Sequence, residues 1–155
     1  MPLNDQRWRA VASERITEAI LELRDDTEFL ERFRAKIDTR SVEGDECDIW
    51  TGAMSSEGYG VVRLPQSRSF VVRAHRVAFM LARGPVPEDR PIIDHVYPVC
   101  RYRFCVNEWH LEPVTQRVND ERRHGTGRAI QRALRDDALT ARHLAALAAH
   151  YKVAA

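Results

Sequence analysis

The sequence predicts an α+β fold, with helices towards both ends of the chain and small antiparallel β-hairpins between them. Three observations predict it. Apolar residues recur at helical spacing in residues 8–37, and apolar and polar residues alternate as in strands between residues 47 and 73. A segment rich in cysteine and histidine follows at residues 94–110, where a loop held by metal is expected.

The chain of 155 residues has the size of one domain with modest extensions. We divide it into an N-terminal helical extension (1–40), a central domain (41–124) and a C-terminal helical tail (125–155). We find no apolar run that could span a bilayer, and the first residues lack the apolar core of a secretory signal. A cytoplasmic location without a membrane partner is therefore expected.

Residues 8–37 are predicted to form two helices. The apolar positions at helical spacing are Trp8, Val11, Ile16, Ala19, Ile20 and Leu23, followed by Leu30, Phe33 and Ile37. Asp25 is the predicted cap of the second helix, because Glu28 three residues later completes a capping-box pattern. The polar stretch 38–46 is predicted to be a loop.

The stretch from residue 59 to residue 73 predicts a β-hairpin with its turn at residues 65–69. Val62 and Leu64 share one face of the first strand. The alternation also places Arg63 and Arg73 on one side of the hairpin, with Arg68 at its tip. A short helix over residues 75–83 is expected next, ended by a glycine.

A second antiparallel pair is predicted from residues 91–96 and 109–115. Residues 115–123 follow as a helix for which Thr115 is the expected cap. The tail over residues 126–155 is alanine-rich and predicted to be a helix for packing or dimerisation, with the opening helices of a helix-turn-helix as the alternative. Its expected buried positions are Leu134, Leu139, Leu144, Leu147 and Tyr151.

The net charge of +1 conceals an asymmetry along the chain. Residues 1–49 carry 8 Lys and Arg against 13 Asp and Glu, whereas residues 50–155 carry 16 against 10. Between residues 58 and 87 there is no acid, but there are five arginines: Arg63, Arg68, Arg73, Arg76 and Arg83. Guanidinium groups bind phosphate in a bidentate manner, so this stretch favours nucleic acid as a partner. An ordinary solvated face is the alternative.

Three cysteines and one histidine have the chemistry of a zinc site. Four residues separate Cys100 from Cys105, and four more separate Cys105 from His110. Cys47 could complete a tetrahedral set of soft and borderline ligands from a distant strand. The alternative is a set of buried free cysteines and a surface histidine.

Asp94 and His95 are adjacent at the end of a predicted strand, and Asn119 lies on the predicted helix that follows. Carboxylate and amide oxygens bind hard cations such as Mg²⁺. A neutral imidazole can take a proton from water near neutral pH. Read singly, these residues could equally be a polar strand end and an exposed helical asparagine.

Taken together, these motifs resemble the HNH endonucleases of the His-Me finger (ββα-metal) group. The pattern "DH…C-x4-C-VN…HLEPVT…N" carries the resemblance, which extends over roughly residues 32–123. More narrowly, the chain is similar to members stapled by zinc, such as those of phages, and to the His-Cys box homing endonucleases. The resemblance implies a ββα-metal core with a zinc-stapled loop, in the cell of a bacterium or a phage-infected host.

The resemblance also implies a role for each matching residue. His95 would be the general base that activates water, and Asp94 and Asn119 would hold one Mg²⁺ or Mn²⁺ ion. Asn107 would brace the loop that carries the base, and Arg76 could contact the scissile phosphate. A structural Zn²⁺ would be held by Cys47, Cys100, Cys105 and His110.

The implied activity is hydrolysis of phosphodiester bonds in double-stranded DNA, leaving 5′-phosphate and 3′-hydroxyl ends. Arg63, Arg68 and Arg73 would contact the DNA, since a two-stranded ribbon fits the major groove. Whether one strand or both are cut is open, and double-strand cleavage would favour a homodimer. Two other classes remain: a non-catalytic zinc-stapled DNA-binding module, which does not need residues 94, 95 and 119 together, and a structural or assembly protein.

Overall fold

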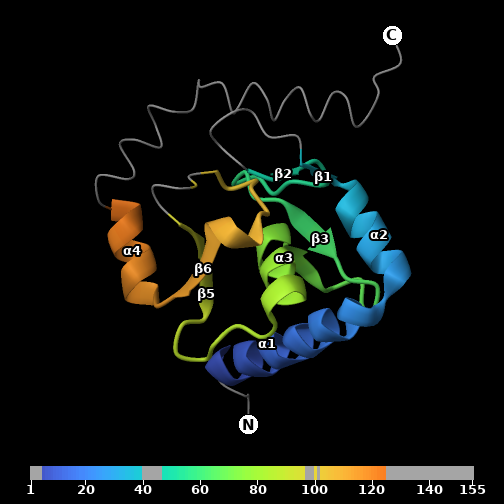
Figure 1. The fold of residues 1–155 in the computed structure, drawn as a ribbon. Coiled ribbons are helices and arrows are strands. Elements are labelled where there is room, and N and C mark those ends of the chain that lie inside the picture. The colour runs from blue at the N-terminus through green and yellow to red at the C-terminus, as the bar shows by residue number, and fades with distance from the viewer. Residues whose placement is uncertain (1–4, 40–46, 97–99, 101, 125–155) are drawn as a thin grey trace.

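The computed structural model describes residues 5–39, 47–96, 100 and 102–124, and of residues 5–12 and 123–124 only the backbone. It contains helices and small antiparallel strand pairs, as expected for an α+β fold (Figure 1). The predicted C-terminal helix and most of the predicted loop 38–46 lie outside the described residues. No helix of the described part is long and apolar enough to cross a membrane.

The N-terminal region forms α1 (Asp5–Glu22), a 3₁₀ turn η1 (Leu23–Asp25) and α2 (Thr27–Ala35). The two predicted helices are confirmed, but the predicted cap is wrong by one residue. Asp26, not Asp25, accepts the hydrogen bond from the backbone N–H of Phe29, at 2.9 Å. The chain makes an extra 3₁₀ turn through Asp25, which moves the cap one position along.

Three strand pairs follow, each antiparallel and two-stranded. β1 (Ile37–Asp38) pairs with β2 (Ile49–Trp50), so the second predicted helix ends before Ile37 and not at it. β3 (Val61–Arg63) pairs with β4 (Val71–Arg73) in the predicted hairpin. Val61 lies opposite Arg73 and Val71 opposite Arg63, so both arginines are on the same, exposed face, as predicted.

Helix α3 (Ala74–Arg83) packs at the centre of the described fold. It contacts α1, the β3–β4 hairpin and β5, and Figure 1 shows it between β3 and the β5–β6 pair. Its buried face includes Val77, Phe79 and Met80. Gly84 ends the helix with a φ of 87°, a backbone conformation that favours glycine, and its N–H bonds to the Met80 carbonyl.

One hydrophobic core joins the N-terminal helices to the rest of the described chain. Ile20 of α1 and Phe33 of α2 belong to the same buried cluster as Trp50, Met80 and Leu111. The rings of Phe33 and Trp50 lie 5.2 Å apart between centroids. The first helices therefore form part of the core against which the later strands are fixed.

The last described elements are β5 (Ile92–His95), the 3₁₀ turn η2 (Glu108–His110), β6 (Leu111–Val114) and α4 (Gln116–His124). The predicted pairing is confirmed, with Asp94 opposite Glu112 and His95 opposite Leu111. Thr115 Oγ1 accepts from the Val118 N–H at 3.2 Å, which confirms the predicted cap of α4. α4 then contacts β5, so two strands and one helix meet around Asp94 and His95.

Candidate functional site

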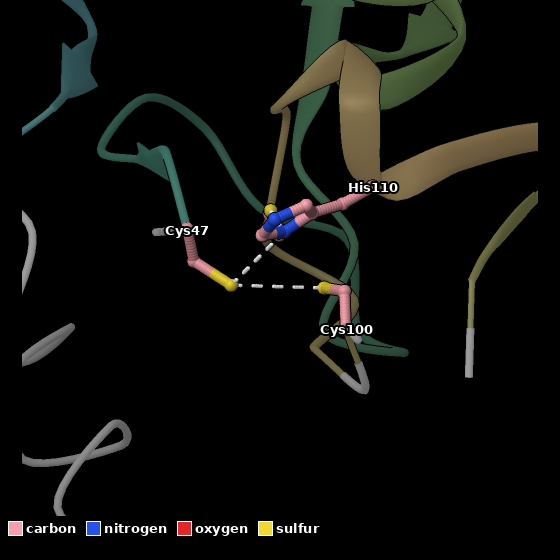
Figure 2. Close-up of side chains that lie close together, drawn as sticks. Cys47, Cys100 and His110 are labelled. Atoms are coloured by element: carbon pink, nitrogen blue, oxygen red, sulfur yellow. Dashed lines mark hydrogen bonds between the residues drawn. The ribbon is translucent and has the colours of Figure 1, made fainter. Parts of the chain in front are cut away.

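Cys47, Cys100, Cys105 and His110 converge on one buried point, as the sequence predicted. Their sulfur atoms and one ring nitrogen all lie within 4.8 Å of one another. Cys47 lies just before β2, Cys100 and Cys105 lie between β5 and η2, and His110 is the last residue of η2. Figure 2 shows the Cys47 sulfur directed at both the Cys100 sulfur and the His110 ring. A cluster assembled from such distant positions is typical of a metal site.

The distances within this Cys₃His cluster fit a tetrahedral metal ion. Sulfurs bound to one zinc lie roughly 3.8 Å apart, and a sulfur and a nitrogen roughly 3.6 Å apart, given the usual Zn–S and Zn–N bond lengths. Cys47 Sγ is 3.7 Å from Cys100 Sγ and 3.4 Å from His110 Nδ1. Cys105 Sγ is 3.6 Å from the same nitrogen. The cluster can therefore hold a metal, and its ligands are those of structural zinc.

The environment of the Cys₃His cluster is dry, and its thiols interact strongly. All four side chains are at most 3 % exposed. Hydrogen bonds with Cys100 and Cys47 lower the pKa of Cys105, whereas hydrogen bonds with Cys100 and Cys105 raise the pKa of Cys47. The ligands are also fixed by backbone bonds, because the Val96 N–H donates to the His110 carbonyl and the Cys100 N–H to the Val96 carbonyl. The cluster thus holds the chain directly after His95.

His95 has a defined tautomer. Its Nε2 donates to the Cys105 carbonyl at 2.9 Å, so the neutral ring carries its lone pair on Nδ1. Burial lowers the pKa of His95 below its ordinary value, against the opposite effect of this hydrogen bond. The ring is therefore neutral at physiological pH and able to accept a proton. Because the accepting carbonyl is that of Cys105, a single hydrogen bond connects His95 to the Cys₃His cluster.

A second histidine, which sequence reasoning did not assign, lies against the first. The ring centroids of His75 and His95 are 5.0 Å apart, and those of His75 and Tyr59 are 5.6 Å apart. His75 Nε2 donates to the carbonyl of Ile93 at 3.2 Å, while its buried Nδ1 has no partner among the described residues. Burial lowers the pKa of His75 to about 3, so this ring is also neutral.

Asp94 forms an ion pair with Arg122 of α4, a residue to which sequence reasoning assigned no role. Arg122 Nη1 lies 3.0 Å from Asp94 Oδ2, and Nη2 donates to Glu112 on the neighbouring strand. Asn119 is half-buried and precedes Arg122 by three residues, which places both on one face of α4. The Arg122 guanidinium makes the bond to the Asp94 carboxylate, and the meeting of Asn119 with Asp94 stays a prediction.

The other predicted residues have the following contacts. Asn107 caps η2, because its Oδ1 accepts from the Trp109 N–H at 3.0 Å. This bond fixes the turn that carries His110, whereas the predicted bracing of the His95 loop stays a prediction. Arg76 donates to the Pro91 carbonyl at 2.9 Å, so its guanidinium helps to hold the start of β5.

The hairpin arginines face solvent, and one has an acidic partner from outside the acid-free stretch. Arg73 pairs with Glu57 at 3.0 Å and lies over the Tyr59 ring, 4.0 Å from its centroid. Arg103 covers the same ring at 5.2 Å. An open groove of about 520 Å³ beside the hairpin is lined by Arg73 and Arg76, among others. Sequence spacing gave no signal for Tyr59 or Arg103, because their contact depends on the tertiary fold.

Comparison with known proteins identifies no relative. No family model matches the chain, no curated protein matches it, and no solved structure matches it. The function therefore has to be argued from the residues and their geometry.

Proposed function

We propose that the chain is a metal-dependent DNA endonuclease of the HNH type, with His95 as the general base. One observation carries the proposal: a neutral histidine, held through Nε2, at a strand end beside a carboxylate. This tautomer leaves Nδ1 free of a proton, which a base requires. The neighbouring Asp94 supplies an oxygen for a cation that would face the same phosphate.

The order of elements supports a ββα-metal core. β5 ends at His95, β6 returns antiparallel to it, and α4 follows at once and contacts β5. In such a core the helix supplies the second cation ligand, and we assign that role to Asn119 of α4. The donor set, a carboxylate and an amide oxygen, suits Mg²⁺ or Mn²⁺.

The catalytic steps can be assigned to groups of this chain. His95 Nδ1 takes the proton of a water molecule aimed at phosphorus, and its bond to the Cys105 carbonyl keeps the ring oriented. Asp94 and Asn119 would hold the cation, which would supply positive charge to the phosphate and to the 3′ oxygen, whose bond to phosphorus breaks. Zinc takes no part in the chemistry. Its four ligands would tie the chain before β2 to the segment between β5 and β6.

Double-stranded DNA is the proposed substrate. Arg63 and Arg68 are exposed on the β3–β4 hairpin, and Arg73 shares the face of Arg63. Guanidinium groups on a two-stranded ribbon can contact phosphates or base edges in the major groove. The groove lined by Arg73 and Arg76 adjoins the start of β5, and His75, which also lines it, lies against His95.

The experiment is a plasmid-nicking assay with and without Mg²⁺, using wild type and His95→Ala. We expect Mg²⁺-dependent nicking by wild type and a loss of at least about 100-fold in the variant, the usual effect of removing a general base. Zinc content and DNA affinity of the variant should match wild type, and unfolding should stay cooperative with a loss of about 1 kcal/mol for the missing bond to the Cys105 carbonyl. Nicking by His95→Ala at the wild-type rate would contradict the assignment of the base.

A non-catalytic zinc-stapled DNA-binding module is the second candidate. It is favoured by the bond between Arg122 and Asp94, because a carboxylate in an ion pair needs no cation to be stable. The same assay separates the two candidates. DNA binding by wild type with no nicking in either Mg²⁺ or Mn²⁺ would support the module and overturn the enzyme.

A further inference from the structure

Two carboxylates face each other beside His95. Asp94 on β5 and Glu112 on β6 are direct partners in the antiparallel register. Like charges in directly opposite positions of two strands repel each other. Their side chains are 22 % and 39 % exposed, so water screens this repulsion only in part. The strand pair therefore needs a positive charge at this point.

Arg122 supplies that charge from α4. Its two terminal nitrogens are divided between the carboxylates, Nη1 to Asp94 and Nη2 to Glu112. The guanidinium therefore lies between the two strands' acids and on the same helix face as Asn119. A cation bound by Asp94 and Asn119 would have to compete with this guanidinium for the Asp94 carboxylate.

We propose that Arg122 is an exchangeable counter-ion of the cation site: it holds Asp94 in the cation-free protein and binds a DNA phosphate once a divalent cation has taken Asp94. Glu112 keeps hold of Arg122 in both states through the second nitrogen. This inference rests on the proposed endonuclease function. It adds two residues, Arg122 and Glu112, to the site.

The exchange follows from charge balance. When Arg122 is bonded to Asp94, its single positive charge offsets one of the two negative charges of Asp94 and Glu112. A divalent cation brings two charges to Asp94, and the nearby guanidinium is then repelled by it. Released from Asp94, one edge of the guanidinium is free for an anion, and a phosphate bound to the same cation lies within its reach. Bidentate binding of phosphate is a strength of arginine over lysine.

The first experiment measures Mn²⁺ binding to zinc-loaded protein by the electron paramagnetic resonance signal of free Mn²⁺. Arg122→Gln should bind Mn²⁺ more tightly than wild type, by about tenfold, because a competing charge has been removed. Arg122→Lys keeps the charge and should stay within about threefold of wild type. The matched control is Arg117→Gln, which removes the same charge from an exposed position of α4 and should change nothing.

The possible results separate the inference from the proposed function. Tighter binding by Arg122→Gln alone supports the exchange. Equal affinity of wild type, Arg122→Gln and Arg117→Gln overturns it while leaving the cation site intact. If wild type and all variants bind no Mn²⁺ at millimolar concentration, the cation site is absent, and both the inference and the proposed function fail.

A second measurement needs no change at Arg122 in the protein under test. In ¹⁵N-labelled wild type, the Arg122 Nε–Hε resonance, identified by its absence from the Arg122→Lys spectrum, should shift during a Mg²⁺ titration. The shift should have the same midpoint as the Mg²⁺ effect on the Asp94 amide. A resonance that stays in place while the Asp94 amide shifts would show that the guanidinium is not displaced.

The third experiment tests the phosphate contact in a His95→Ala background, where DNA is bound but not cut. With Mg²⁺, adding Arg122→Gln should weaken duplex binding and lower the slope of log affinity against log salt by about one. Without divalent cation the same change should leave the slope unaltered, because Arg122 is then held by Asp94. A slope that is equal with and without Arg122 in Mg²⁺ would exclude the contact.

Discussion

At the scale of single residues, His75 shows how burial sets protonation. The residue is 4 % exposed, and its ring lies near those of Tyr59 and His95. One nitrogen bonds to the Ile93 carbonyl and the other has no partner among the described residues. A proton on this ring would be a buried charge, and burial accordingly lowers its pKa to about 3.

His75 should therefore make folding stability depend on pH. The unfolded side chain binds a proton near its ordinary pKa of about 6.5, whereas the folded one binds it only near pH 3. The contribution of His75 to the free energy of unfolding is therefore present above about pH 6.5 and is lost as the pH falls towards 3. About 2 kcal/mol of this free energy should be lost between pH 7 and pH 5. Urea unfolding of wild type and His75→Gln at both pH values measures this. The variant should be less stable at pH 7 but lose about 2 kcal/mol less on acidification.

Acid also protonates the cysteines and histidine of the Cys₃His cluster, so zinc content has to be measured at both pH values. Loss of zinc would affect wild type and His75→Gln alike and cancel in the comparison. Parallel pH profiles of the two proteins would contradict the account of His75.

Some residues of the site could be predicted from the sequence and others could not. The Cys₃His cluster was predictable, because Cys100, Cys105 and His110 follow one another at short intervals and thiolates with an imidazole are the usual ligands of zinc. Arg122 and Glu112 were not, since their contact with Asp94 depends on the strand register and on where α4 lies. His75 was hidden for the same reason, because only the packing of α3 against β5 brings its ring to His95.

At the scale of elements, local signals predicted the kinds of element better than their ends. The β3–β4 hairpin and the β5–β6 pair followed from alternation and turn residues, and α4 from its cap. The end of α2 was placed two residues too late, because Ile37 continues the helical spacing but pairs with Trp50 in a strand. Its predicted cap was one residue too early, because two adjacent aspartates offer the same chemistry.

The two aspartates allow a matched test of the α2 cap. Asp26→Ala should destabilise the protein by about 1 kcal/mol, because it leaves the Phe29 N–H without its acceptor at the helix start. Asp25→Ala removes the same charge one position earlier and should cost less than about 0.5 kcal/mol. Urea unfolding of both variants decides between the positions. Equal losses would mean that charge near the helix end matters and the hydrogen bond does not.

At the scale of the whole molecule, the hydrophobic core and the Cys₃His cluster stabilise different parts of the described fold. The core joins α1, α2 and α3 to Trp50 and Leu111. The cluster joins Cys47, near β2, to the chain between β5 and β6. Tyr102 and Phe104 pack against it, and Cys105 belongs to the cluster's own group of buried residues and not to the main core. The position of Cys105, whose carbonyl orients His95, therefore depends on the cluster more than on the core.

Removing the metal should loosen the His95 end of β5 before the helical core unfolds. We expect about one Zn²⁺ per purified chain. When a chelator removes this zinc from the thiolates, backbone amide hydrogen exchange should rise first at Val96, Cys105 and His110. Cys47→Ser should reproduce this change, whereas Phe104→Leu, which alters only packing beside the cluster, should keep its zinc. The Phe33–Trp50 core should stay protected in all cases. If the purified chain holds no zinc and Cys47→Ser leaves hydrogen exchange unchanged, the four residues are buried side chains that bind no metal, and the prediction is wrong.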